Sequence, residues 1–359
     1  MCSRKPIFKL ALTGTPIPNT FKDIYNCIKI LYPDDIYGTL NYLCPSRLEK
    51  ADNNESIETE VRETLQPIFV RTTKNDLCIP PAEPDDTYSL LAVPSDNEKL
   101  ILKYTRDSYG NNILLLFIRL IQASSNPELL LKSLNKSDII NCLDEDDDEL
   151  ENLINSAKND VLYKDELKDL IANTPNSTKY NLTVSKIKNL TSKNEKVIVW
   201  CLFIDTIDKL NRNLLSMGIK STTITGRDDP VLRNKRIDEF KYGNTQVLIT
   251  NPNTLAESIS LHKVCHHAIY LEYGFNLTYL LQSKDRIHRV GLANDTKTYY
   301  YFAITDGDLG MGCIDKHIYN RLVEKADKML RTVESNDLIP MYNSTDLEDI
   351  KAILKDMNL

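Results

Sequence analysis

The feature that most constrains the fold is a series of apolar, β-rich runs in the second half of the sequence, with helical patterns between them. Three of the runs contain no polar break, as expected for strands that helices cover on both faces. Strands that alternate with helices build βαβ units, whose strands are parallel. We therefore predict an α/β fold with a parallel sheet over residues 196–305. The predicted strands are Val197–Trp200, Thr222–Thr225, Val247–Ile249, Ala268–Leu271 and Tyr299–Phe302, of which Thr222–Thr225 is the weakest.

The first half has a different pattern. Its one strong strand signal, Ile7–Leu12, predicts a buried strand at the very start, as if the chain began at the end of another α/β domain. Capping signals and apolar stripes predict helices that begin near Thr20 and Ser95, and Leu114–Ile121 reads as a strongly apolar helix. Asp144–Glu151 is almost entirely acidic, which favours a solvated segment over a specific site.

Composition excludes several classes of protein. The chain has 359 residues, enough for about two domains, and a net charge of −7. No run approaches the ~20 apolar residues that cross a bilayer, and the first apolar run is too short for a signal peptide. Eight cysteines occur without a Cys-x-x-Cys pair, which predicts reduced thiols in an intracellular, cytoplasmic protein and no metal site. The acidic balance still allows a local basic groove for nucleic acid.

Two stretches suggest chemistry. Leu12–Asn19 (LTGTPIPN) would present hydroxyls and backbone N–H groups at the carboxyl end of a strand, where ligands bind in open α/β sheets. A plain strand–turn–helix junction is the alternative. In the sequence QSKDRIHRVG, helical spacing would place Gln282, Arg286 and Arg289 on one face, with Gly291 at the end of the helix. That face suits an anion, because guanidinium groups bind phosphate oxygens. A solvated charged face is the alternative.

Together, and in this order, the motifs resemble the Swi/Snf-type family of helicase-like ATPases of helicase superfamily two. The resemblance runs from about residue 7 to 330, and its wording is closest to the prokaryotic or phage branch. It implies two RecA-like lobes that hold ATP between them and move along duplex DNA. The stretches that carry it are Leu12–Asn19, Pro67–Lys74, Leu120–Pro127, Ser177–Lys179, Ala256–His262, Gln282–Gly291 and Ile314–Lys325.

The resemblance also implies roles for individual residues. Arg286 and Arg289 would be arginine fingers on the ATP phosphates of the opposite lobe, so we expect neither to make an essential contact within this chain. The other implied site residues are Gln282, Asp285 and Gly14, in support of the ATP site, and Thr13, Thr15, Thr250, Ser258 and Ser260, in coupling and in contact with the DNA backbone.

Two motifs that ATP hydrolysis requires are missing. The sequence contains no GxxxxGK[ST] phosphate loop, and no Asp-Glu pair follows an apolar strand in the first half. In the family, both lie upstream of the LTGTP stretch. We therefore expect ATP and Mg²⁺ to be shared with a first lobe that this chain lacks, supplied in cis or in trans. The chain alone should be inactive as an ATPase.

These observations favour the carboxyl-terminal portion of an ATP-dependent DNA translocase, with duplex DNA and the first lobe as partners and no membrane. The alternative is a non-enzymatic DNA- or protein-binding module. A Rossmann-type enzyme is disfavoured, because no GxGxxG follows a predicted strand. The predicted organisation is a remnant of the first RecA-like lobe over 1–33, a mostly helical region over 34–175 with an acidic loop at 144–151, a second RecA-like lobe over 176–332 and a tail over 333–359.

Overall fold

In the computed structural model, the chain divides into two compact units. The first comprises residues 1–73 and 323–345, and the second comprises residues 74–322 and 346–359. The structure describes residues 8–12, 21–33, 42–70, 72, 76–83, 89–142, 165–255, 259–274, 276–306, 314–334 and 346–357.

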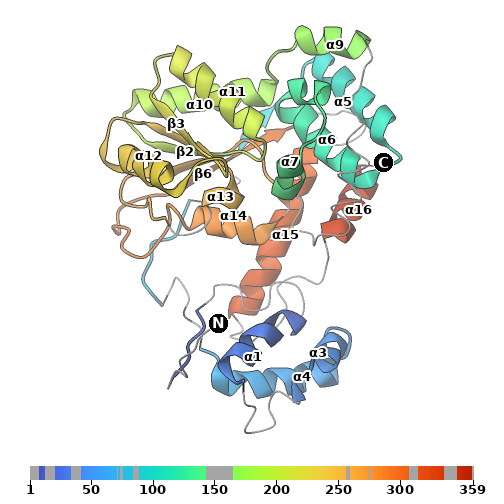
Figure 1. The fold of residues 1–359 in the computed structure, drawn as a ribbon, viewed down its shortest axis with the longest axis vertical. Helices are drawn as coiled ribbons and strands as arrows, with labels where there is room; N and C mark the ends of the chain where they lie inside the picture. The colour runs from blue at the N-terminus through green and yellow to red at the C-terminus, as the bar shows by residue number, and fades with distance from the viewer. Residues whose placement is uncertain are drawn as a thin grey trace. The chain divides into compact units, whose positions relative to one another are not determined.

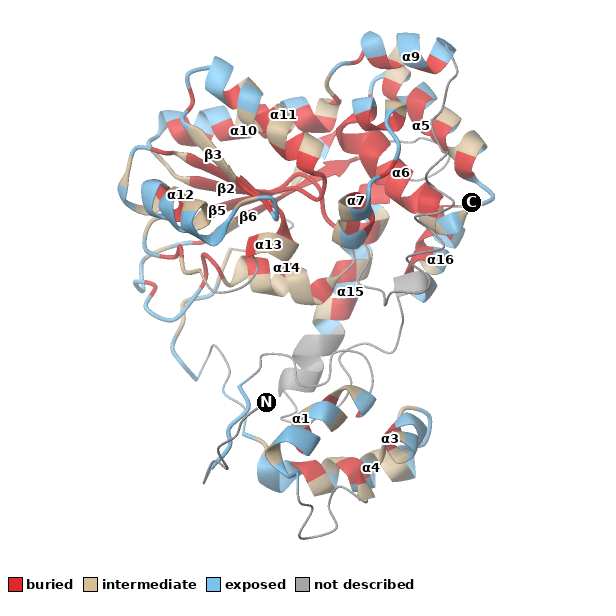
Figure 2. Cartoon of the chain, in the orientation of Figure 1, coloured by how far each residue is buried: buried red, intermediate tan, exposed pale blue. Residues whose placement is uncertain are grey.

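A six-stranded sheet forms the centre of the second unit, with the strand order β1-β6-β5-β2-β4-β3 (Figure 1). Every neighbouring pair of strands is parallel, which confirms the predicted parallel sheet. The central strands are buried along their whole length, because helices cover them on both faces (Figure 2). The strands are β1 (Leu90–Ala92), β2 (Val197–Trp200), β3 (Ser221–Ile224), β4 (Val247–Thr250), β5 (His267–Tyr270) and β6 (Tyr299–Thr305).

The edge strand β1 comes from a segment of the first half for which no strand was predicted. Leu90 pairs with Ala303 and Ala92 with Thr305, so β6 has neighbours on both sides. A run of three residues is too short to show a period of two, and its pairing depends on a strand about 200 residues away.

Helices follow the strands as the βαβ pattern predicts. Ser177, Asp229 and Asn276 each accept backbone N–H groups in the first turn of a helix, as polar N-caps do. Pro230 occupies the first position of its helix, where the missing N–H is not needed. These helices are α10 (Thr178–Ser192), α11 (Ile204–Ser216), α12 (Pro230–Tyr242), α13 (Pro252–Leu255) and α14 (Leu277–Lys284).

The helices that precede the sheet in sequence belong to the same unit. Glu98 completes the predicted capping box with Ser95, and its carboxylate also accepts the backbone N–H of Thr178 at 2.7 Å. This contact ties the helical region to the start of α10, so the boundary expected at residue 175 does not separate two units. The helices are α5 (Asp96–Tyr109), α6 (Ile113–Ser125), η4 (Pro127–Leu131), α7 (Lys136–Cys142), α9 (Asp165–Ala172) and α16 (Asp346–Asp356).

The first unit is helical, with a small core of its own. Phe21 and Ile28 from the predicted helical stripe are buried, as are Leu48 and Val61. The expected cap residue Thr20 lies outside the described residues. Helix α15 (Ile314–Glu334) contributes residues to both units. The other elements are η1 (Phe21–Ile24), α1 (Tyr25–Leu31), α3 (Pro45–Ala51), α4 (Glu55–Leu65) and η2 (Gln66–Ile68).

The predicted buried strand at the start of the chain is wrong. Residues 8–12 form no strand, and Phe8, Leu10 and Leu12 are 90%, 82% and 87% exposed. A β-rich run becomes a strand only where a neighbour accepts its backbone hydrogen bonds, and no described strand pairs with this one. The acidic segment at 144–151 lies outside the described residues. Within the part of the chain that the structure describes, no helix is long and apolar enough to cross a membrane.

Candidate functional site

The two predicted arginines lie in a turn rather than on one helix. Helix α14 ends at Lys284, and residues 285–288 continue as turns, so the predicted helix up to Gly291 is wrong. Gly291 has a φ of +92°, a conformation that suits glycine. The turn sends the side chains of Arg286 and Arg289 into different environments.

Arg286 is anchored inside the chain. It is only 9% exposed, its Nε donates to the carbonyl oxygen of Gln282 at 2.8 Å, and its Nη1 donates to that of Ile259 at 3.1 Å. The backbone N–H of Leu261 donates in turn to the carbonyl oxygen of Arg286 at 2.8 Å. Arg286 therefore holds two segments together, which contradicts the expectation that it makes no essential contact within the chain.

Arg289 is exposed, and one hydrogen bond links its guanidinium to another described side chain. Its Nη1 donates to Ser260 Oγ at 2.9 Å, so the structure brings these two predicted site residues together. Among the described residues, its guanidinium forms no ion pair with a carboxylate. A guanidinium in this state can bind an anion through its remaining N–H groups.

The remaining predicted residues are placed as follows. Gln282 lies on the last turns of α14, and its Oε1 is buried with no hydrogen-bond partner among the residues that the structure describes. Asp285 is the C-cap residue of α14. Thr250 at the end of β4 is fully buried, and its hydroxyl donates to the carbonyl oxygen of Ile224 at 2.7 Å, so it is not presented to DNA in this structure. Thr13, Gly14, Thr15 and Ser258 lie outside the described residues.

His262 is a buried residue in this region to which the sequence assigned no role of its own. It lies in the turn after Ser260, and both of its ring nitrogens are buried with no hydrogen-bond partner in the part of the chain that the structure describes. Burial lowers the pKa of His262, and the positive charges of Lys263 and Arg289 lower it further. The residue ends the stretch Ala256–His262, but sequence spacing could not show its burial, because that depends on the packing of segments far apart in the chain.

Three of the stretches that carried the family resemblance meet in a buried polar cluster. Lys179 Nζ lies 2.7 Å from Asp315 Oδ1 and 3.1 Å from Ser124 Oγ, and the side chains of the ion pair are 0% and 3% exposed. The other oxygen of Asp315 accepts the backbone N–H of Thr305 at 3.1 Å. This cluster joins α6, α10, β6 and α15, so these motif residues support the fold.

Glu272, just after β5, is a second buried carboxylate with full hydrogen bonding. Its Oε2 accepts the backbone N–H groups of Leu202 and Phe203, each at 3.0 Å, and its Oε1 accepts the hydroxyl of Ser125 at 2.6 Å. Burial raises the pKa of Glu272, and these hydrogen bonds oppose the rise. The carboxylate fixes the loop after β2 against β5 and α6.

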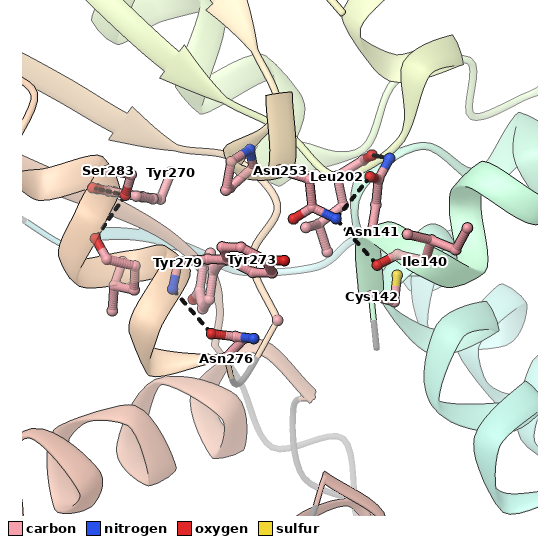
Figure 3. A pocket seen from close by; sticks show the side chains of 13 residues that line it. Ile140, Asn141, Cys142, Leu202, Asn253, Tyr270, Tyr273, Asn276, Tyr279 and Ser283 are labelled. Atoms are coloured by element: carbon pink, nitrogen blue, oxygen red, sulfur yellow. Dashed lines mark hydrogen bonds between the residues drawn. The ribbon is translucent and has the colours of Figure 1, made fainter. Parts of the chain in front are cut away.

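The end of α7 lies beside the loops that follow β2 and β4, where Asn141 is close to Leu202 and Asn253 (Figure 3). Asn141 donates to the carbonyl oxygen of Leu202 at 2.8 Å and accepts from the amides of Asn251 and Asn253 at 3.1 and 3.2 Å. One side chain thus links the loops after β2 and β4. The adjoining cavity has a volume of only about 30 Å³, which is enough for about two water molecules. It therefore offers no space for a nucleotide.

The fold and these contacts can be compared with known proteins. Residues 179–291, which include Lys179, Ser260 and Arg289, match the family model for the helicase conserved C-terminal domain. The structure is similar to the crystal structure of the C-terminal part of the Fun30 ATPase domain, with a TM-score of 0.50 and 18% identity. The superposition covers 78% of this chain and 99% of the Fun30 chain. The second unit therefore has the fold of a RecA-like helicase lobe.

Sequence relatives agree with this class. The chain is 24% identical over 301 residues to an uncharacterized ATP-dependent helicase of Mycoplasma genitalium. This alignment covers 82% of this chain and 26% of that protein. It is 25% identical over 341 residues to the ATP-dependent helicase FUN30 of Saccharomyces cerevisiae. This alignment covers 79% of this chain and 30% of FUN30. Chromatin remodeling factor mit1 of Schizosaccharomyces pombe is 22% identical over 374 residues, which cover 99% of this chain and 24% of mit1.

Residues 179–291 thus match the helicase conserved C-terminal domain, and the chain is similar in sequence to proteins named as ATP-dependent helicases and as a chromatin remodeling factor. It spans between 24% and 30% of the length of these three relatives. The predicted closeness to a prokaryotic or phage branch is not confirmed, since bacterial and yeast proteins match at similar identity.

Proposed function

We propose that this chain is the carboxyl-terminal portion of an ATP-dependent DNA translocase. It supplies Arg289 to the phosphates of an ATP that a first RecA-like lobe holds with Mg²⁺, in cis or in trans, and it supplies part of a surface for duplex DNA. A partner of this kind implies a location inside the cell. The observation that carries the proposal is the exposed guanidinium of Arg289, hydrogen-bonded to Ser260 within the matched helicase segment.

The side chains fit one part of an ATP site. A guanidinium and a hydroxyl can both donate hydrogen bonds to phosphate oxygens. A positive charge placed where negative charge develops in the transition state accelerates phosphoryl transfer. The part of the chain that the structure describes contains no group of three or more His, Cys, Asp or Glu side chains that could hold a metal ion. The proposal therefore assigns the magnesium ligands and the phosphate loop to the first lobe.

The roles of the two arginines differ in this proposal. Arg289 acts on the phosphate. Arg286 positions the turn that carries Arg289, because it is bonded to the backbone of Gln282 and Ile259. Gln282 Oε1, which has no hydrogen-bond partner among the described residues, would accept from a group of the first lobe or of the nucleotide.

The test is a DNA-stimulated ATPase assay with the first lobe supplied as a fused or separate polypeptide. Arg289→Ala should lower the rate roughly a thousandfold or more, as expected for an arginine finger. Arg212→Ala, which removes an exposed arginine on α11, is the matched control and should leave the rate unchanged. Normal hydrolysis by the Arg289 variant, or robust hydrolysis by the chain alone, would contradict the proposal.

The DNA-binding part needs a separate measurement. Fluorescence anisotropy with a labelled duplex should show binding by the chain whose affinity falls steeply with salt, because phosphate contacts release counterions. Binding without any ATPase in the reconstituted assay would favour the alternative, a non-enzymatic module.

A further inference from the structure

His262 is a buried side chain whose bonding is incomplete. It is 8% exposed, and among the described residues neither Nδ1 nor Nε2 has a hydrogen-bond partner. Buried polar atoms in native proteins are nearly always paired, so an exception calls for a physical explanation. A ligand that binds beside the imidazole would supply the missing partner.

The charges around His262 select the kind of ligand. Lys241 at the end of α12, Lys263 in the same turn, Arg289 after α14 and the neighbouring His266 all act on the imidazole, and each is cationic or becomes so on protonation. Arg289 is the same side chain that donates to Ser260. A cluster of this sign attracts an anion with several acceptor oxygens.

The backbone leaves space on the Nε2 side of the ring. Gly291 has a φ of +92°, and a Cβ added there would lie 3.4 Å from His262 Nε2, with no other described atom within 4 Å apart from those of Gly291 and its two chain neighbours. The position that a side chain would fill is therefore open beside this nitrogen. The turn that carries His262 is held in place, because the N–H of Leu261 donates to the carbonyl oxygen of Arg286.

We propose that His262 and Arg289, with the charge of Lys263, form a binding subsite for a phosphate group in which the imidazole donates a hydrogen bond from Nε2. The phosphate belongs either to a nucleotide polyphosphate or to the DNA backbone. If the phosphate belongs to ATP, the subsite rests on the proposed function and adds His262 to the residues that contact the nucleotide. The imidazole gains a proton more easily beside a bound anion, so the affinity for phosphate increases as the pH falls through the titration of His262.

The test follows the histidines of the full chain by NMR after ¹³C labelling of their rings. The sequence has five histidines, at 262, 266, 267, 288 and 317, and single substitutions assign their signals. Pyrophosphate, ATP and a short DNA duplex are titrated separately. We expect the His262 signal to shift saturably and the midpoint of its pH titration to rise by about one pH unit, which corresponds to about tenfold tighter binding of the anion to the protonated form. His317 on α15 is the internal control and should not respond.

Two variants separate this site from nonspecific binding. Arg289→Ala should weaken the response of His262 about tenfold or more. His262→Gln keeps a donor of similar reach and should retain more pyrophosphate binding than His262→Leu. The fluorescence of Trp200, the only tryptophan in the chain, shows whether each variant is folded.

The outcomes distinguish the subsite from the proposed function. A response to pyrophosphate and ATP assigns the phosphate to a nucleotide, and a response to duplex DNA alone assigns it to the DNA backbone. If none of the three ligands moves the His262 signal in the folded protein, the subsite is refuted, whether or not Arg289 proves essential for the reconstituted ATPase. If His262 responds but Arg289→Ala leaves that ATPase unchanged, the subsite stands and the proposed function falls.

Discussion

Replacing Asp315 with alanine should destabilise the second unit strongly. The substitution leaves the ammonium of Lys179, whose side chain is 0% exposed, without its only ion-pair partner in the described chain. It also removes the acceptor of the Thr305 N–H, which bonds to Asp315 at 3.1 Å. Breaking a buried ion pair by removing one partner costs about 3–5 kcal/mol, because an uncompensated charge remains inside the protein.

Lys179→Met should be less damaging, since Asp315 keeps two hydrogen-bond donors, the Thr305 N–H and the Ser124 hydroxyl. Removing both charges together, as Lys179→Met with Asp315→Leu, leaves no buried charge. Replacing a whole buried pair by apolar groups is often nearly neutral. The double variant should therefore lose at least ~2 kcal/mol less than the sum of the two single variants.

Urea unfolding followed by Trp200 fluorescence is the appropriate assay. Trp200 is the only tryptophan and is fully buried at the end of β2, so its signal reports on the unit that contains the ion pair. The control is Lys132→Ala, which breaks the exposed pair with Asp205 at 2.6 Å and should cost no more than about 1 kcal/mol. Additive losses in the double variant, or a loss below about 1 kcal/mol for Asp315→Ala, would refute the reasoning.

Three further predictions concern the same unit and can be measured by the same urea unfolding. Arg286→Ala should lower the free energy of unfolding by about 1–3 kcal/mol, because two backbone carbonyls lose a charged donor, whereas Arg289→Ala should change it by no more than about 0.5 kcal/mol. Asn141→Ala should cost about 1–3 kcal/mol, because it removes the shared partner of the loops after β2 and β4. Burial raises the pKa of Asp138 from 3.8 to about 6. The contribution of Asp138 to the free energy of unfolding is therefore most favourable below about pH 4, where the carboxyl is protonated, and this contribution is lost as the pH rises through about 6. Asp138→Asn should flatten this dependence and stabilise the protein at pH 7.5 by up to about 3 kcal/mol, and an unchanged profile between pH 4 and 8 would contradict the assignment.

The sequence predicted the central sheet well because its strands carry the signal locally. Each of β2, β4 and β5 is buried on both faces, so each appears as a continuous apolar run that needs no knowledge of its partners. The opposite holds for β1 and for residues 8–12. Leu90–Ala92 becomes a strand because β6 lies beside it, and residues 8–12 do not become one because no described strand does. Pairing over long separations is absent from any local pattern.

The site was predictable only in its residue types. Motif order pointed to Arg286, Arg289 and Ser260, and the structure does bring Arg289 and Ser260 together. Motif order could not show that Thr250 points into the sheet, because a threonine at the end of a strand can face either way. Motif order included His262 at the end of the stretch Ala256–His262 but gave it no role, since the lack of described partners at its two nitrogens arises only when the turn packs near Gly291.

The end of α14 at Lys284 changes how the arginine pair can be tested. Spacings of four and seven residues along a helix imply two equivalent arginines on one exposed face, and a double substitution then probes function alone. In the turn, Arg286 bonds to the backbone of Ile259 and Arg289 to the hydroxyl of Ser260. A double variant would thus combine a lost phosphate contact with a loosened turn, and a fall in activity could not be assigned to either. Only the single substitution of Arg289, in a protein whose unfolding free energy is unchanged, isolates the charge that the proposed function requires.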